Sequence, residues 1–389
     1  MRALWNDIRY GLRMLAASPG FTAVAILSLA IGIGANTSTF SLVDALLLRP
    51  LPVPHSSGIV RVLSTTPSDP FGSISYPDYL DFRNQTKAVS GLLALYAIPI
   101  GFAKDPKSLA RPKLGLGVSA NFFDVLEIQP ALGRAFRADD DRRPVVVLSD
   151  SLWLSEFNRD PSVIGSTVSL SKMQFTVIGI APKTFPGLEL FVHEDFYVPI
   201  GTLPLFGPRQ KTELEQRDVL SVNVYGRLGP GQTAEQAQAQ LQAIAHNLEQ
   251  AYPATNRGRG VRAMPEMRAR FAMNSDNAVD SAVLLAIAIS VLLIACANVA
   301  NILLSRGRAR AREIAIRLAI GASRRRLFQQ LITESLLLAL IGGAAGLLLV
   351  LFSIDFFASV RLPTSLPIWL VARPDLRVLL FACATTLAS

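Results

Sequence analysis

The fold is decided by a charge-free stretch at residues 21–43, FTAVAILSLAIGIGANTSTFSLV. No charged residue lies between Arg13 and Asp44. A helix of this length can cross a hydrocarbon core about 30 Å thick. We therefore predict a first transmembrane span over residues 19–48. The alternative is a cleaved signal peptide, because basic residues precede the apolar run, but the run is longer than a typical signal-peptide core.

Three further apolar runs follow in the sequence. Residues 281–304 and 327–355 are long enough to span a membrane, and the second of them contains Glu334. We expect Glu334 to face protein, water or the interface, because a carboxylate facing lipid is costly. A fourth run occupies residues 375–389 and is still apolar where the sequence stops. It is expected to be the start of a fourth span, apparently truncated.

The positive charge is concentrated beside these runs. The formal net charge is +9, yet residues 49–280 have 24 Lys and Arg against 23 Asp and Glu, a net charge of +1. Residues 305–326 have eight arginines and one glutamate, a net charge of +7. Basic residues in short loops stay on the cytoplasmic side. We predict that loop 305–326 and residues 1–18 are cytoplasmic, and that residues 49–280 and loop 356–374 are extracytoplasmic. The distribution indicates a lipid bilayer and no nucleic acid as partner.

The first 18 residues predict an amphipathic helix lying on the cytoplasmic leaflet. Apolar residues recur at helical spacing with arginines between them: Trp5, Ile8, Leu12 and Leu15 with Arg2, Arg9 and Arg13. Ser18, Pro19 and Gly20 then interrupt the pattern. The alternative is a basic N-terminus without stable structure.

Two glycines in the third predicted span, Gly342 and Gly346, have the GxxxG spacing that lets helices approach closely. We predict that another helix packs there. A defined dimer contact is the narrower alternative.

Residues 49–280 break into short strand-like and helix-like stretches separated by turn residues, which predicts a folded α+β domain. The clearest predicted strands are residues 144–148, 175–180 and 222–228, and a helix is predicted over 233–252 with its N-cap at Thr233. The predicted fold class is therefore an integral membrane α-helical bundle of four spans, the fourth incomplete, with a large α+β extracytoplasmic domain inserted between spans one and two.

The central domain offers no pattern for catalysis or metal binding. Ser149-Asp150-Ser151 lacks the glycines of a nucleophile elbow and is predicted to form a loop or cap. His193-Glu194-Asp195 lacks the spacing of two metal ligands on one helix face. Asp139-Asp140-Asp141 lacks the spaced ligands of a calcium loop and is predicted to be a solvated turn. Cys296 and Cys383 both lie in apolar runs, which excludes a disulfide framework in the domain. We expect no catalytic residue, cofactor-binding residue or metal ligand.

The sequence contains neither the pattern Gly-x-x-x-x-Gly-Lys-Ser/Thr nor any Gly-Lys dipeptide. It therefore has no P-loop for nucleotide phosphates. We expect the chain not to be an enzyme and any ATP to be bound by another subunit.

Three stretches of the sequence are specific enough to be compared with known protein families. The first is AIGIGANT at 30–37, which continues to LRPLP at 48–52. The second is VSANFF at 118–123 with LGRAF at 132–136, and the third begins with REIAIR at 312–317. Together they resemble the permease part of the MacB/FtsX superfamily of ABC transporters, especially the ADOP-like and MacB-like permeases with a periplasmic core domain.

The resemblance implies a set of ATPase-coupling residues in the Arg-rich loop: Arg312, Glu313, Ile314, Ala315, Arg317 and Gly321. The pattern is physically consistent with a short amphipathic helix, because Glu313 and Arg317 can pair at i,i+4 spacing and Gly321 can end the helix. The alternative is that these arginines only hold topology and bind anionic lipid.

The resemblance also implies a function. The chain would be the permease subunit, or the N-terminal half, of a MacB-like ABC transporter in the bacterial cytoplasmic (inner) membrane. A separate ABC ATPase subunit would bind ATP and drive movement of the periplasmic domain for export or mechanotransmission. Further expected partners are a second copy or second permease half, and a periplasmic adaptor. The rival hypothesis is an ATPase-independent, membrane-anchored binding or scaffold protein.

Overall fold

The computed structural model describes residues 9, 11–13, 15–44, 48–105, 108–188, 194–273, 275–309, 316, 319, 324–359 and 376–388. They form two compact units. The spanning unit comprises the described residues before Pro50 and from Ser275 onward. The domain unit comprises the described residues of Pro50–Asn274.

The spanning unit consists of long helices: α2 (Pro19–Val43), α10 (Ser275–Ala309), α12 (Arg324–Ser359) and the shorter α13 (Leu376–Ala388). Three of them contain windows long and apolar enough to cross a membrane: Thr22–Ser41, Ala282–Asn301 and Ser335–Phe352. These windows fall within the predicted spans 19–48, 281–304 and 327–355, and confirm three membrane-spanning candidates. Of the expected N-terminal interfacial helix, residues 1–8, 10 and 14 lie outside the described residues.

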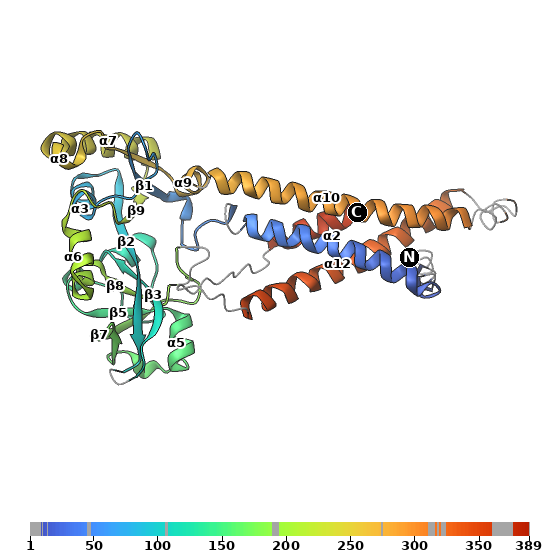
Figure 1. Ribbon diagram of the computed structural model, residues 1–389, viewed down its shortest axis with the longest axis horizontal. Coiled ribbons are helices and arrows are strands. Elements are labelled where there is room, and N and C mark those ends of the chain that lie inside the picture. The colour runs from blue at the N-terminus through green and yellow to red at the C-terminus, as the bar shows by residue number, and fades with distance from the viewer. Residues whose placement is uncertain are drawn as a thin grey trace. The chain divides into compact units, whose positions relative to one another are not determined.

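Helix α2 is the centre of the spanning unit, and Figure 1 shows it alongside α10 and α12. It contacts α10, α12 and α13, and α12 also contacts α13. The buried apolar cluster joins Leu29 and Ile33 of α2 to Val299 of α10 and Leu338 of α12. Proline at the first position of α2 fits a helix start, because its missing N–H would be unpaired there anyway.

The domain unit is built on a ten-stranded mixed sheet with the order β10-β1-β9-β2-β3-β8-β5-β7-β4, and β6 pairs with β2 and β7. The strands are β1 (Ile59–Thr65), β2 (Val89–Ala103), β3 (Arg111–Val118), β4 (Leu132–Gly133), β5 (Val145–Leu148), β6 (Thr167–Leu170), β7 (Met173–Ile180), β8 (Phe196–Pro199), β9 (Asn223–Leu228) and β10 (Gly260–Pro265). The helices are α3 (Tyr76–Gln85), α4 (Phe122–Leu126), α5 (Asp150–Phe157), α6 (Pro208–Glu215), α7 (Ala234–Ala251), α8 (Pro253–Asn256) and α9 (Glu266–Met273).

The predicted elements of this domain are confirmed. The predicted strands 144–148, 175–180 and 222–228 correspond to β5, β7 and β9. The predicted helix 233–252 is α7, and Thr233 is its N-cap in a capping box with Gln236. The α+β class follows from these elements.

The two faces of the sheet carry separate cores. In β1, Val60 and Val62 belong to a core that includes Leu241 of α7, whereas Ile59 belongs to a core that includes Phe122 of α4. The alternation follows from the strand period of two, which sends successive side chains to opposite faces. We call these the α7 core and the α4 core.

Strand β10 ends the sheet, and glutamines of α7 bond to its backbone. Gln238 donates to the carbonyl of Val261 at 3.0 Å and accepts from the N–H of Ala263. Gln242 accepts from the N–H of Val261. An open strand edge invites pairing with another chain, so these amides close the edge at two residues.

Candidate functional site

The predicted ATPase-coupling residues Arg312, Glu313, Ile314, Ala315, Arg317 and Gly321 lie outside the described residues. Their role therefore remains a prediction. In the sequence they lie between α10 and α12. The contacts of these two helices are consequently the part of the candidate site that the structure describes.

Gly342 and Gly346 of α12 lie against α2. A Cβ added to Gly342 would lie 2.7 Å from the Cβ of Leu29. A Cβ added to Gly346 would lie 3.0 Å from the carbonyl oxygen of Ala30 and 3.2 Å from the amide nitrogen of Gly34. The structure thus brings α2 onto these glycines within one chain, and a side chain at either position would crowd α2. The two helices run parallel, because later residues of α12 meet later residues of α2.

The contact between α2 and α10 runs in the opposite direction. A Cβ on Gly32 would lie 3.0 Å from the Cβ of Ala295. One turn later on α2, Asn36 donates a hydrogen bond of 2.6 Å to the carbonyl oxygen of Ala288, two turns earlier on α10. The two helices are therefore antiparallel.

Polar side chains of α2 are buried where an apolar span would be expected. Asn36, Thr37 and Ser41 are all at most 3% exposed. The hydroxyls of Thr37 and Ser41 donate to carbonyls one turn earlier in the same helix, so they need no hydrogen-bond partner on another helix. Asn36 differs, because its amide also reaches another helix. An apolar medium makes such interhelical bonds useful for holding two spans together.

Asp44, at the end of α2, is fully buried and lies between two arginines. Its carboxylate is 3.5 Å from Arg49 Nε and 3.7 Å from the guanidinium of Arg377 on α13. Arg377 also donates to the carbonyl of Leu48 at 3.2 Å. The sequence signal for the ion pairs of Asp44 was its position as the first charged residue after the apolar run.

The direction of α13 follows from two contacts with α2. Phe40 stacks on Phe381 with ring centroids 4.2 Å apart, and the later residue Asp44 meets the earlier residue Arg377, so α13 runs antiparallel to α2.

In the domain unit, the entry and exit of the chain meet at one pair of strands. Strands β1 and β10 are antiparallel, with Val60 opposite Pro265. The chain enters just before β1 and leaves just after β10 through α9, which contacts both strands. The two segments that join this domain to the spanning helices in sequence therefore lie at the same end of the β1–β10 pair.

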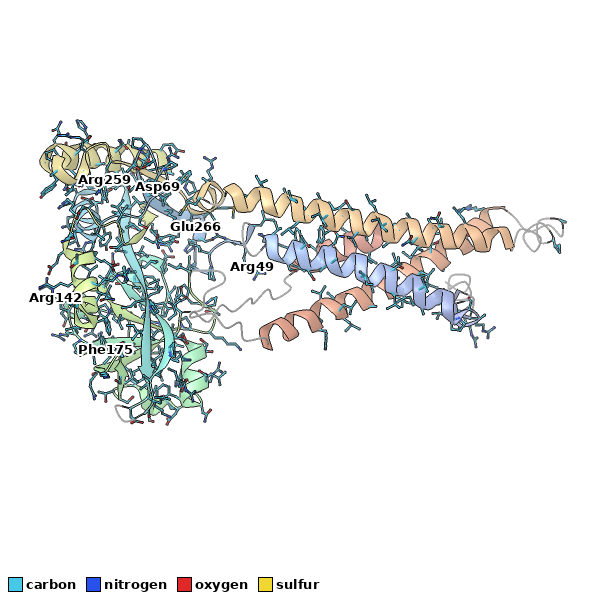
Figure 2. All side chains as sticks on the ribbon, viewed as in Figure 1. Arg49, Asp69, Arg142, Phe175, Arg259 and Glu266 are labelled. Carbon is cyan, nitrogen blue, oxygen red and sulfur yellow. The ribbon has the colours of Figure 1, made fainter. Side chains whose placement is uncertain are left out.

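Helix α9 is held by a buried ion pair, and Figure 2 shows Glu266 at its start. Arg270 donates to Glu266 through Nε at 2.9 Å and through Nη2 at 2.7 Å. Both residues are less than a tenth exposed. Removing one partner would leave a buried charge, so the pair resists local opening of α9. The i,i+4 spacing of these opposite charges was its sequence signal.

Two of the motifs that lack a catalytic or metal-binding pattern have structural roles. Ser149 caps α5, since its hydroxyl accepts from the N–H of Leu152, which confirms the predicted cap. Asp195 accepts from the N–H of Leu114 and lies 3.5 Å from Lys113, and burial raises the pKa of its carboxyl. His193 lies outside the described residues.

The prediction that Asp139-Asp140-Asp141 forms a solvated turn is wrong for Asp140. Its side chain is fully buried and receives hydrogen bonds from the guanidinium of Arg134 and the N–H of Arg137. The bonds from Arg134 hold the pKa of this carboxyl below its usual value. Only Asp139 behaves as expected, on the surface beside Arg143. Sequence spacing could not show that Arg134, on a neighbouring loop, would cover the middle carboxylate.

A small cavity lies between α3, α7 and β10, lined by residues that include Ser64, Asp78 and Asn256. Its volume of about 20 Å³ accommodates one or two water molecules. It is too small for an organic ligand.

Helices able to span a membrane, joined in one chain to an α+β domain, define an integral membrane protein with a large folded domain. The family model described as MacB-like periplasmic core domain matches residues 22–244, more than half of the chain, and the model described as FtsX-like permease C-terminal matches residues 285–388. The chain belongs to the MacB-like periplasmic core domain family. It is a permease of the MacB/FtsX superfamily, a membrane protein with an extracytoplasmic domain.

Several curated relatives are named macrolide export ATP-binding/permease protein MacB. The protein of Bdellovibrio bacteriovorus is 25% identical and the match covers 88% of this chain and 51% of the relative. That of Escherichia coli is 26% identical, with 96% and 56% covered. The chain thus spans about half the length of these relatives. The periplasmic region of MacB from Actinobacillus actinomycetemcomitans is a similar solved structure, at 14% identity and a TM-score of 0.41, covering 57% of this chain and 94% of that one.

Proposed function

We propose that this chain is the membrane-spanning permease subunit, or the N-terminal half of a permease, of a MacB-like ABC system. A separate ATPase subunit binds and hydrolyses ATP and moves the spanning helices, and the helices move the extracytoplasmic domain. This movement of the domain serves export or mechanotransmission. The chain itself holds no cofactor.

The observation that carries the proposal is the combination of two regions in one chain. A MacB-like periplasmic core domain match is followed by an FtsX-like permease match. A binding or scaffold protein would need one membrane anchor, whereas the described part of this chain includes three helices able to span and a further helix packed on them.

The helix contacts suggest a route for the movement. The predicted Arg-rich loop lies between α10 and α12 in the sequence, and both helices contact α2. A partner that displaces the loop therefore moves two helices that hold the same third helix. Helices α2 and α10 are the elements that lead into and out of the domain along the chain. Such packed helices switch between discrete arrangements rather than bending continuously.

The proposed topology has four spans, with the N-terminus cytoplasmic and residues 49–280 outside, in the bacterial cytoplasmic membrane. The alternating directions of the helices around α2 support it, because α12 runs parallel to α2 while α10 and α13 run antiparallel. A chain that crosses the bilayer four times in succession requires this alternation.

Assembly with further subunits is part of the proposal. The relatives combine ATP-binding and permease in their names, and these 389 residues contain no P-loop pattern, so we assign ATP to a partner subunit. We further propose pairing with a second copy or a second permease half, and a periplasmic adaptor as an additional partner.

The test is affinity purification of the tagged, membrane-extracted chain, with mass spectrometry and an ATPase assay of the recovered proteins. We expect an ABC ATPase to co-purify with the chain. Glu313→Ala and Arg317→Ala should lose it, whereas Arg308→Ala, which removes a charge near the end of α10 and outside the implied set, should retain it. A stable chain that recovers no ATPase under gentle extraction would favour the anchored scaffold instead.

A further inference from the structure

Arg227 of β9 has an unusual set of partners for a residue inside a sheet. Only 8% of the residue is exposed. Its Nε donates to the carbonyl of Val125 at 2.6 Å, and its Nη2 and Nη1 donate to the carbonyls of Pro54 at 3.1 Å and His55 at 3.3 Å. One guanidinium thus joins the end of α4 to the segment that enters the domain.

A carboxylate completes this group. Glu127 lies 3.6 Å from Arg227 Nε and accepts a hydrogen bond of 2.7 Å from Nδ1 of His55. The bond from His55 lowers the pKa of the Glu127 carboxyl. His55 and Glu127 both have positive φ, at 47° and 56°. Non-glycine residues adopt this conformation rarely and keep it where their surroundings determine it. The backbone at His55 and at Glu127, the two residues that flank the Arg227 guanidinium, is therefore held in a specific geometry.

The entering segment, residues 51–55, is also held by burial. Leu51 and Val53 are part of the α4 core and are 4% and 8% exposed. We call residues 51–55 the anchor segment. The turn that follows it, Ser56–Gly58, has no buried residue, and β1 begins only at Ile59. Attachment to the domain therefore precedes the first strand.

We infer that displacement of the first span enters the domain at the anchor segment, and that Arg227 is the positioning residue that fixes this segment to β9 and α4. The inference rests on the proposed function and names the segment through which movement of the first span is passed to the domain. A pull on residue 50 must break the bonds of Arg227 and expose Leu51 and Val53 before it can reach β1. Strand β9 lies between β1 and β2, so the load is applied inside the sheet and not at its edge strand.

Two insertions test where the load is applied. Two glycines placed between Arg49 and Pro50 add up to about 7 Å of slack before the anchor segment. The same insertion between Ser57 and Gly58 adds it after the anchor segment. Nucleotide-dependent change in hydrogen exchange of the domain is measured in the complex with the co-purified ATPase. We expect the first insertion to abolish the change and the second to preserve it. Equal behaviour of both insertions would overturn the inference.

A second measurement needs no ATPase. In the extracted chain, Arg227→Gln should speed hydrogen exchange of residues 51–58 by at least about tenfold while exchange in β5 and β7 is unchanged. Arg61→Gln is the matched control, since this arginine of β1 bonds only to the side chain of Asn223 among the hydrogen bonds described. If Arg227→Gln does not fold, Glu127→Gln removes the charge partner and should raise exchange in the same segment.

Unchanged protection in the variants would overturn the role of Arg227. The experiments distinguish failure of this inference from failure of the proposed function. Failure to recover any ATPase would contradict the proposed function and leave the exchange result intact. An associated ATPase with unprotected residues 51–58 in the unaltered chain would contradict the inference alone.

Discussion

The side-chain amide of Asn36 donates a hydrogen bond of 2.6 Å to the carbonyl oxygen of Ala288, and this bond joins α2 to α10. The same amide donates to the carbonyl of Gly32 within its own helix. Ala288 is 4% exposed, so the bond is shielded from water and lipid. It connects the helix that leads into the domain with the helix that leads out of it.

Asn36→Ala should therefore weaken the spanning unit. Interhelical hydrogen bonds in membranes contribute on the order of 1 kcal/mol, and we expect a loss of that size in the free energy of unfolding. Thermal unfolding of the detergent-extracted chain measures it. Ser290→Ala is the control, because this hydroxyl of α10 bonds only within its own helix, to Ala286, among the bonds described. Equal losses in both variants would show that the interhelical bond contributes nothing.

Gly346→Ala and Gly20→Ala should have opposite effects. Replacing glycine by alanine inside a helix gains up to about 1 kcal/mol in helix propensity. At Gly20 no atom lies within 4 Å of the new Cβ, so we expect a neutral or stabilising change. At Gly346 the Cβ meets the backbone of Ala30 and Gly34, and overpacking should cost about 1–3 kcal/mol. Stabilisation by Gly346→Ala would contradict the close α2–α12 contact.

Gln238→Met should expose the edge of the sheet. The substitution keeps the length and helix propensity of the side chain but leaves the Ala263 N–H and the Val261 carbonyl without the glutamine. Losing such bonds costs about 1–3 kcal/mol where the groups are shielded from water. Hydrogen exchange of the Ala263 amide should rise, and association through β10 should become detectable. Gln250→Met, on the exposed end of the same helix beside His246, should change neither measurement.

The stability of the domain should depend on the ionisation of Asp140. Arg134 lowers the pKa of this carboxyl in the folded state, so its contribution is fully present above the ordinary pKa near 4 and disappears as pH falls through the folded value. Asp140→Asn should be less stable than the unaltered chain by about 1–3 kcal/mol at pH 7.

Unfolding measured from pH 7 to about pH 2.5 should show the two chains converging as the carboxylate is protonated. Asp139→Asn is the control, because its carboxylate is 59% exposed and forms a surface pair with Arg143 that contributes little. A constant difference between Asp140→Asn and the unaltered chain over this range would assign the loss to something other than charge.

Much of the fold could be predicted from local pattern. The three spans follow from the absence of charge over residues 21–43 and its near absence in two later runs. The capping box at Thr233 follows from local residue types, and so do the strands β5 and β7. In each case the signal lies within about twenty neighbouring residues, which is the range over which hydropathy and helix or strand period operate.

The candidate site was predicted only in part. Gly342 and Gly346 predicted a close helix contact, but not that α2 of the same chain would make it. Asn36 and Asp44 lie in or beside the run that decided the first span, and their partners Ala288 and Arg377 are hundreds of residues away. The solvated turn expected at Asp140 was wrong because burial depends on what covers a residue, and spacing in sequence does not contain that information.

The sequence by itself determined that the chain spans a membrane and carries an α+β domain, because transfer of apolar segments into lipid and strand or helix periodicity are properties of contiguous residues. Only the tertiary structure decided that Arg227 meets Pro54 and His55, and that β1 and β10 bring the two ends of the domain together. A guanidinium can bond to any carbonyl within reach. Which carbonyl it reaches is set by the packing of the whole sheet.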